Sequence, residues 1–163
     1  MHDLQSIQNA IRGRTMDNRE TQLPHIQEAE RLLDSITDGR GSTTNLNNRW
    51  PDLLVPRLLS RPQTSQISVI NQAAGGNRIL NDGLGPNTLA RLDRDVLAQG
   101  GVEYAMIFEG VNDIGTAATD ATTQKTVGDR LISAFKQITT RLRTADITAS
   151  HTATRNAKIL VRE

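Results

Sequence analysis

The chain has 163 residues, a length typical of one domain, and its composition excludes several classes of function. Apolar residues make up 36% and aromatic residues 2%, so the core is lean beside the apolar share of about 45–50%, glycine included, in ordinary globular chains. Nineteen basic residues against eighteen acidic ones give a net charge of +1, which offers no electrostatic basis for binding nucleic acid or an anionic membrane. Without cysteine, disulfides and thiolate metal sites are excluded. No segment approaches the length of a membrane span, and the first residues lack the apolar stretch of a signal peptide.

The first part of the chain is predicted to be helical and polar. Helical spacing of apolar residues predicts helices over 3–12, 24–33 and 50–59, separated by polar loops at 13–23 and 37–48. Pro51 suits the first turn of the third helix, where its missing N–H is not needed.

The second part alternates between strands and helices. The sequence predicts strands over 67–70 and 102–108, helices over 86–99 and 123–143, and a weak strand at 158–161 in a polar tail. Short connections between a strand, a helix and the next strand are typical of parallel strands joined by right-handed crossovers. The sequence therefore predicts an α/β fold.

Three loops carry residues suited to chemistry at the carboxyl ends of strands, where parallel sheets bind ligands. Ser35, placed just ahead of a glycine-rich turn, can act as a nucleophile, and its own N–H can donate to an oxyanion. Gly76 offers an N–H that no side chain obstructs, and the side-chain amide of Asn112 is a neutral, directional donor. Each also has a plain structural interpretation: a helix cap at Asp34 and Ser35, a tight turn at Gly76, and an Asx-turn at Asn112.

Taken together, the three segments resemble the SGNH (GDSL-type) hydrolase family, in its carbohydrate-esterase-like branch. The matching strings are Asp34-Ser35-Ile36-Thr37, then Asn71-Gln72-Ala73-Ala74-Gly75-Gly76-Asn77-Arg78, then Gly110-Val111-Asn112-Asp113. The resemblance implies a three-layer α/β/α fold with a parallel, flavodoxin-like sheet. It also implies hydrolysis of a small-molecule or carbohydrate ester through an acyl-serine on Ser35, with no metal or cofactor. The oxyanion hole would combine the N–H groups of Ser35 and Gly76 with the amide of Asn112.

The sequence departs from this family at both ends. The family's Asp-x-x-His block is not found, and none of the three histidines, His2, His25 and His151, lies in such a pattern. Without a base, Ser35 keeps its proton and is a poor nucleophile at neutral pH. Upstream, the family's first strand is replaced by the charged, helix-period residues 27–33. We therefore expect a fold that is incomplete at both ends: an atypical helical segment at 1–33, an SGNH hydrolase-like core at 34–143 and an atypical polar tail at 144–163.

Two other interpretations remain open at this point. One is an inactive derivative that only binds an acylated carbohydrate or a protein partner, and the other is a non-functional fragment. Neither a Gly-x-Ser-x-Gly nucleophile elbow, a Walker loop nor a His-Glu-x-x-His motif occurs, which disfavours other α/β-hydrolases, nucleotide binding and zinc hydrolysis. The acyl group, the alcohol and the oligomeric state cannot be read from the sequence. The resemblance is to esterases that are commonly secreted, but localisation stays open.

Overall fold

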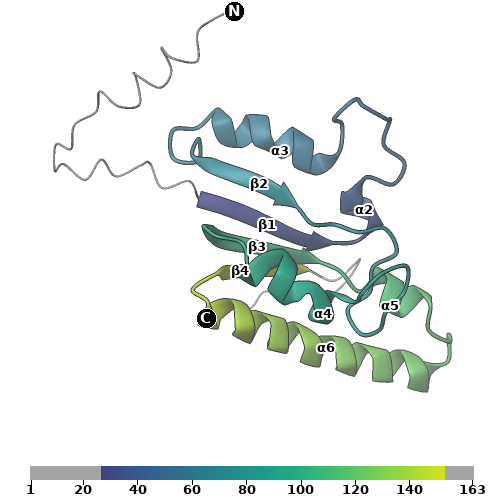
Figure 1. Ribbon diagram of the computed structural model, residues 1–163. Coiled ribbons are helices and arrows are strands. Elements are labelled where there is room, and N and C mark those ends of the chain that lie inside the picture. Colours follow the sequence, from purple (N-terminus) through teal and green to yellow (C-terminus); the bar gives the residue numbers. More distant parts are fainter. Residues whose placement is uncertain (1–26, 153–163) are drawn as a thin grey trace, which may run out of the picture.

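The computed structural model describes residues 27–152 (Figure 1). In chain order its elements are β1 (Gln27–Leu33), α2 (Ser35–Asp38), α3 (Trp50–Leu59), β2 (Ile67–Asn71), α4 (Thr88–Leu92), the π-helical η1 (Asp93–Leu97), β3 (Val102–Phe108), α5 (Val111–Gly115), α6 (Ala121–Thr144) and β4 (Thr148–Thr152). None of the helices in this range is both long and apolar enough to span a bilayer.

The four strands form one parallel sheet in the order β2-β1-β3-β4. This confirms the flavodoxin-like order, in which the first strand of the sequence lies between the next two. The predicted helix over 24–33 is wrong at 27–33, because these residues form β1, paired with β2 on one side and β3 on the other. Pairing along both edges overrides the helical pattern of the segment, since strand formation depends more on context than on local propensity.

Other boundaries also differ from the sequence prediction. The polar tail contains β4, which pairs with β3 from Tyr104↔Thr148 to Phe108↔Thr152. The helix expected over 86–99 starts at Thr88, which Asn87 precedes as a cap, and continues as η1. The loop at 110–113 turns into α5. The expected helix at 3–12, loop at 13–23 and strand at 158–161 lie outside the described residues.

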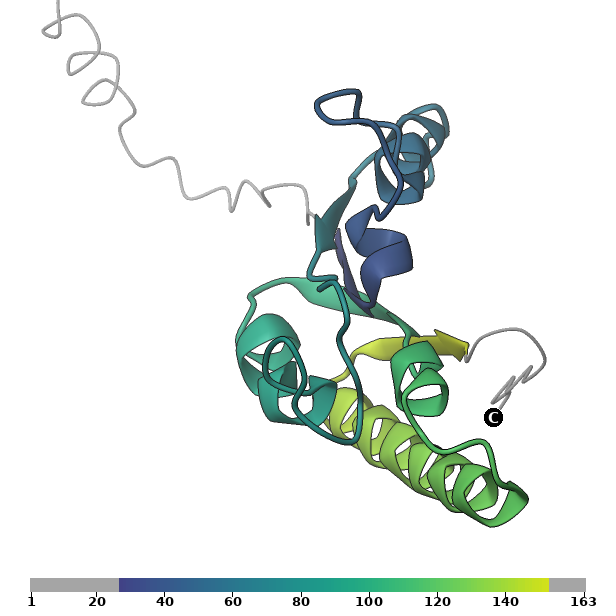
Figure 2. The same ribbon diagram turned by 90° about the vertical axis from the view of Figure 1, so that its right-hand side faces the viewer.

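The helices lie in two layers, one on each face of the sheet. The connection from β1 to β2 runs across the sheet in the direction opposite to the two later connections, so right-handed crossovers place its helix on the other face. Figure 2 shows this arrangement, with α3 on one side of the sheet and α4 on the other. The fold thus has the three α/β/α layers that the sequence predicted.

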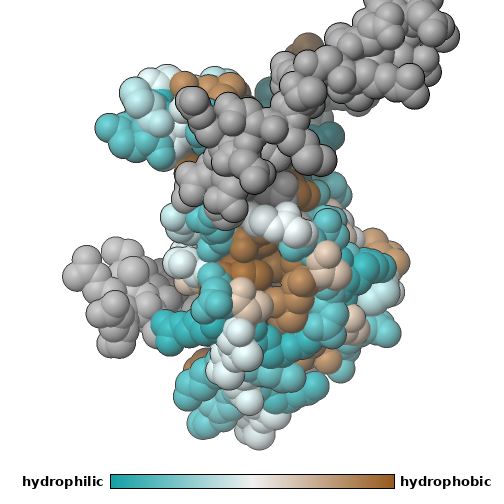
Figure 3. Space-filling view, turned by 60° about the vertical axis from the view of Figure 1, so that its left-hand side comes forward, coloured by the Kyte–Doolittle hydropathy of each residue, from teal (hydrophilic) through white to brown (hydrophobic). Residues whose placement is uncertain are grey.

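The hydrophobic core lies between β3 and the helices α4, η1 and α6. Its buried apolar residues are Ile79, Leu92, Val96, Ala105, Ile107, Leu131, Ala134, Phe135, Ile138, Leu142 and Ile147. Each fully buried large side chain contributes roughly 1.5–3 kcal/mol. The opposite face of β3 is more open, with Tyr104 42% and Met106 38% exposed. Figure 3 shows an apolar patch near the middle of this view, with hydrophilic residues around much of it.

Candidate active site

The loops that leave β1, β2 and β3 carry the three residues singled out in the sequence. β1 lies between the other two strands, and all three run in parallel, so their carboxyl ends meet at one edge of the sheet. Ser35 follows β1 after one residue, Gly76 lies in the turn after β2, and Asn112 lies in α5 after β3. The fold therefore brings the three loops to the same edge.

Ser35 is held at the first position of a short, well-capped helix. The Asp34 carboxylate accepts a hydrogen bond from Ile36 N at 2.9 Å, and burial raises the pKa of this carboxyl. At the other end, Gly39 has φ 107° and its N–H donates to Ser35 O at 3.0 Å. Thr37 is fully buried, and its Oγ1 accepts from Trp50 Nε1 at 2.8 Å. The plain cap interpretation of Asp34 is thus confirmed, and the cap fixes the backbone that presents Ser35.

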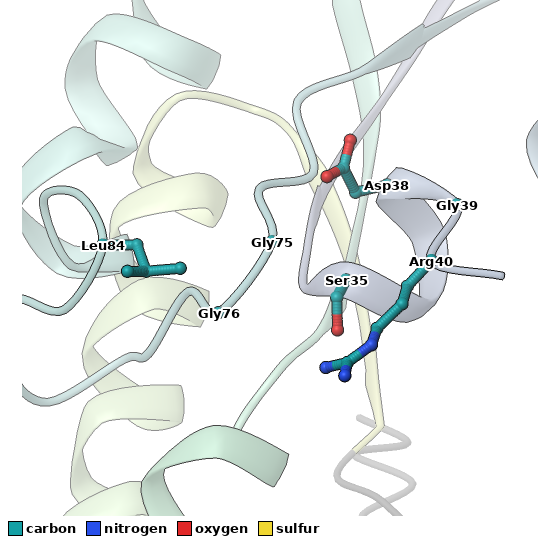
Figure 4. Close-up of a pocket in the computed structure, with 7 residues that line it drawn as sticks. All are labelled: Ser35, Asp38, Gly39, Arg40, Gly75, Gly76 and Leu84. Atoms are coloured by element: carbon teal, nitrogen blue, oxygen red, sulfur yellow. The ribbon is translucent and has the colours of Figure 1, made fainter. Parts of the chain in front are cut away.

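A cavity of about 410 Å³ opens at this edge of the sheet (Figure 4). Its lining residues come from the loops after β1 and β2 and are Ser35, Asp38, Gly39, Arg40, Gly75, Gly76 and Leu84. Ser35 and Gly76 therefore face a common space. Asn112 is not among the lining residues.

Gly76 has a backbone conformation that side chains rarely adopt, with φ 72°. A Cβ atom at this position would also lie 2.9 Å from Leu84 Cδ1. Within the described part of the chain, neither its N–H nor that of Ser35 donates to a backbone carbonyl. Both N–H groups thus remain available to a ligand in the cavity.

Asn77, directly after Gly76, fixes this loop through several hydrogen bonds. It is 4% exposed, and its Oδ1 accepts from Thr88 Oγ1 at 2.8 Å and from Arg91 Nη2 at 2.9 Å. Its Nδ2 donates to Pro86 O at 2.8 Å. Because both ends of the amide are satisfied, the peptide that follows Gly76 has one orientation.

The side chain of Asn112 is directed at the same loop. Its Nδ2 donates one hydrogen to Asn77 O at 2.8 Å, and an amide nitrogen carries two hydrogens. The second hydrogen has no partner within residues 34–150 and stays available. Next to it, the buried carboxylate of Asp113 accepts from Ile79 N and Leu80 N, each at 2.9 Å. The loops after β2 and β3 are therefore tied together by these two neighbouring side chains.

Buried charges lie behind this edge of the sheet. The Arg91 guanidinium contacts Asp95 Oδ2 at 2.8 Å and lies 3.8 Å from Glu109 Oε1. Glu109 is 1% exposed, and within residues 34–150 neither of its carboxylate oxygens has a hydrogen-bond partner. Burial and the neighbouring Asp34 raise the pKa of Glu109 to about 8, against the opposing effect of Arg91. This carboxyl group therefore holds a proton at neutral pH.

One histidine, His151, stands within the described residues. His151 lies in β4 opposite Ile107, two strands away from β1 in the sheet, and His2 and His25 lie outside the described range. Within that range no group of three or more His, Cys, Asp or Glu side chains could hold a metal ion.

Sequence reasoning missed four residues that shape the site: Asn77, Arg91, Glu109 and Asp113. Asn77, Glu109 and Asp113 stand in the loops that the sequence singled out, but no role was predicted for them or for Arg91. The available signal was their position, since three of them stand within three residues of Gly76 or Asn112.

The sequence matches the family model described as GDSL-like lipase/acylhydrolase over residues 34–161. No curated protein matches the chain. Among solved structures, the acetyl xylan esterase AlAXEase is 22% identical with a TM-score of 0.56, over 76% of this chain and 56% of that one. A variant of Axe2, an acetyl xylan esterase from Geobacillus stearothermophilus, is 21% identical with a TM-score of 0.53, over 77% and 58%. A carbohydrate acetylesterase family member from Sinorhizobium meliloti is 18% identical with a TM-score of 0.52, over 81% and 58%. At these identities the likeness is one of fold, and the chain spans less than two-thirds of the length of each.

Proposed function

Because the chain belongs to the GDSL-like lipase/acylhydrolase family, we propose that its chemistry is serine-dependent ester hydrolysis at the edge of the sheet where Ser35 lies. The observation that carries this proposal is the cavity that Ser35 shares with Gly76. A hydroxyl and an unobstructed backbone N–H in one open space supply a nucleophile and an oxyanion donor, two of the groups that acyl transfer uses.

In this proposal Ser35 Oγ attacks the carbonyl carbon of the ester, and its proton passes through solvent water to the oxygen of the leaving alcohol. The carbonyl oxygen becomes an oxyanion, which the N–H groups of Ser35 and Gly76 and the second N–H of Asn112 Nδ2 stabilise. The alcohol leaves with a proton, and water then releases the acid from the acyl-serine. Preorganised donors of this kind lower the barrier because they need no rearrangement when the charge develops.

The proposed substrate class is a small-molecule or carbohydrate ester. Two of the structures compared above are described as acetyl xylan esterases, which favours a short acyl group on a sugar alcohol. A cavity of about 410 Å³, within the usual range of ligand pockets, fits a group of that size.

The test is hydrolysis of p-nitrophenyl acetate by the full chain and by three variants. We expect Ser35→Ala to remove nearly all of the enzymatic rate and Asn112→Ala to lower it by about 10²–10³-fold, as for loss of one oxyanion donor. Ser60→Ala is the matched control, since its exposed hydroxyl only bonds Arg57 O. A measurable rate that neither Ser35→Ala nor Asn112→Ala lowers would contradict the proposal.

A second candidate function is binding of an acylated ligand without turnover. It is favoured by the place of His151 in β4, two strands away from β1, because a serine without a base beside it is a poor nucleophile. This alternative predicts a slow residual rate that falls with Asn112→Ala but not with Ser35→Ala. If Ser35→Ala does abolish the rate, His25→Ala and His151→Ala identify the base.

A further inference from the structure

Arg40 places a cation in the cavity that holds the Ser35 hydroxyl. In Figure 4 the guanidinium of Arg40 and the hydroxyl of Ser35 point toward one another, and the carboxylate of Asp38 points away from both. The remaining lining residues are uncharged: Ser35, Gly39, Gly75, Gly76 and Leu84. The end of the cavity beside Ser35 is therefore positive.

The backbone of Arg40 is fixed, although its side chain is exposed. Its N–H donates to Ser35 O at 2.8 Å, so Arg40 stays at a set position relative to the serine. The preceding Gly39 packs closely against Arg49, whose Cδ would lie 2.7 Å from a Cβ at Gly39. Because the turn cannot shift without disturbing this contact, the backbone from which the Arg40 side chain extends is fixed next to Ser35.

The guanidinium has neither an ion pair nor a hydrogen bond within residues 34–150. The buried Arg91, in contrast, pairs with Asp95 and bonds Asn77. A guanidinium offers five N–H donors in a planar fork that matches a carboxylate bidentately. Asp38 does not pair with it in the described residues, and in Figure 4 its carboxylate points away from the guanidinium.

We propose that Arg40 determines specificity by binding a carboxylate on the ester substrate, so that the site prefers esters that carry a negative charge. This inference rests on the proposed function, because it assumes that the ester group lies at Ser35. The carboxylate can belong either to the acyl part or to the alcohol part of the ester, and the chemistry of recognition is the same.

Binding rather than turnover tests the inference, which keeps its failure separate from a failure of the proposed function. The full chain carrying Ser35→Ala is labelled with ¹⁵N and titrated with two pairs of esters. Monomethyl succinate and methyl succinamate differ by a charge on the acyl side, and acetoxyacetate and acetoxyacetamide differ by a charge on the alcohol side. Amide shifts of Gly39, Gly75 and Gly76 report binding in the cavity.

In at least one pair we expect the charged ester to bind about fivefold more tightly than its neutral partner, which is the upper range for an exposed ion pair. The pair that shows this preference identifies whether the carboxylate belongs to the acyl part or to the alcohol part. The preference should shrink at 0.5 M salt through screening. Adding Arg40→Gln to the Ser35→Ala chain should abolish the preference for the charged ester. Adding Arg57→Gln instead, which removes an exposed charge outside the cavity, should preserve this preference. Equal affinities within both pairs, a preference that survives Arg40→Gln, or shifts confined to residues away from the cavity each overturn the proposal. Wild-type turnover of p-nitrophenyl acetate is measured separately and reports only on the proposed function.

Discussion

Replacing Glu109 with glutamine should change how the stability of the fold depends on pH. Glu109 is buried, and among the residues that the structure describes its oxygens have no hydrogen-bond partner, so ionising it in the folded state is costly. Its pKa is raised from 4.5 to about 8, first by burial and then by the charge of Asp34. Glutamine has the shape of the protonated acid and cannot ionise, so the variant keeps the neutral form at every pH.

The sign follows from proton binding. Between about pH 4.5 and 8 the folded chain holds a proton on Glu109 that the unfolded chain has released, so the free energy of unfolding falls as the pH rises through this window and levels off above it. A shift of this size corresponds to about 5 kcal/mol if it is fully expressed, at 1.36 kcal/mol per pKa unit. That is a large part of the net stability of about 5–15 kcal/mol typical of a domain.

Urea unfolding followed by the fluorescence of Trp50, the single tryptophan, measures this effect at steps from pH 5 to pH 9. We expect the free energy of unfolding of Glu109→Gln to exceed that of wild type by an amount that grows with pH and reaches several kcal/mol at pH 8. Other groups titrate in both proteins, so the difference between the two curves isolates Glu109. Asp129→Asn serves as the control, because it removes an exposed carboxylate paired with Lys125 and should cost about 0.5 kcal/mol or less. Parallel curves for wild type and Glu109→Gln would refute the reasoning.

Three further substitutions, with Gly85→Ala as the control for one of them, test packing and backbone in the same unfolding assay. Gly76→Ala should destabilise the fold by about 1–2 kcal/mol, because Gly76 has a positive φ. Gly85→Ala, which adds a methyl group into open space, should be neutral or slightly stabilising. Equal effects of the two substitutions would contradict the strain expected at Gly76. Asn77→Ala should lower the free energy of unfolding by roughly 2–4 kcal/mol, because the buried Arg91 loses hydrogen bonds. A loss below 1 kcal/mol would show that the loop does not depend on Asn77. Ile138→Ala should cost about 2–5 kcal/mol, since its side chain is fully buried, and a near-neutral result would place the core elsewhere.

Elements with a strong local signal were predictable from the sequence. α3 has the predicted bounds, with Pro51 at the start of the helix, and β3 has the bounds predicted for the second strand. The long helix α6 buries Leu131, Ala134, Ile138 and Leu142, the face that its 3.6-residue spacing indicated. In these segments local propensity and tertiary packing agree.

β1 could not be predicted from its own residues. Gln27–Leu33 has a helical pattern, and only its neighbours, β2 and β3, determine that it is a strand. The resemblance to the family requires a strand at this place, whereas the local periodicity of residues 27–33 is that of a helix. The same dependence on distant partners explains why β4 was missed in the polar tail.

The site was predictable only in part, for a similar reason. Ser35, Gly76 and Asn112 stand in recognisable strings, and the fold brings their loops to one edge. The contacts that fix those loops join residues far apart in the sequence, such as Asn112 with Asn77, and Asp113 with Ile79. No local pattern encodes which distant carbonyl or N–H an Asn or Asp side chain will reach.

The most direct test of the central claim is to identify the residue that an ester-like electrophile modifies. The full chain is incubated with a fluorophosphonate, digested, and analysed by peptide mass spectrometry, with Asn112→Ala alongside. If Ser35 is the nucleophile beside an oxyanion hole, a single adduct forms on Ser35, and it forms more slowly in Asn112→Ala because one donor is lost. An adduct on another hydroxyl, or none after prolonged incubation, would contradict the assignment of Ser35.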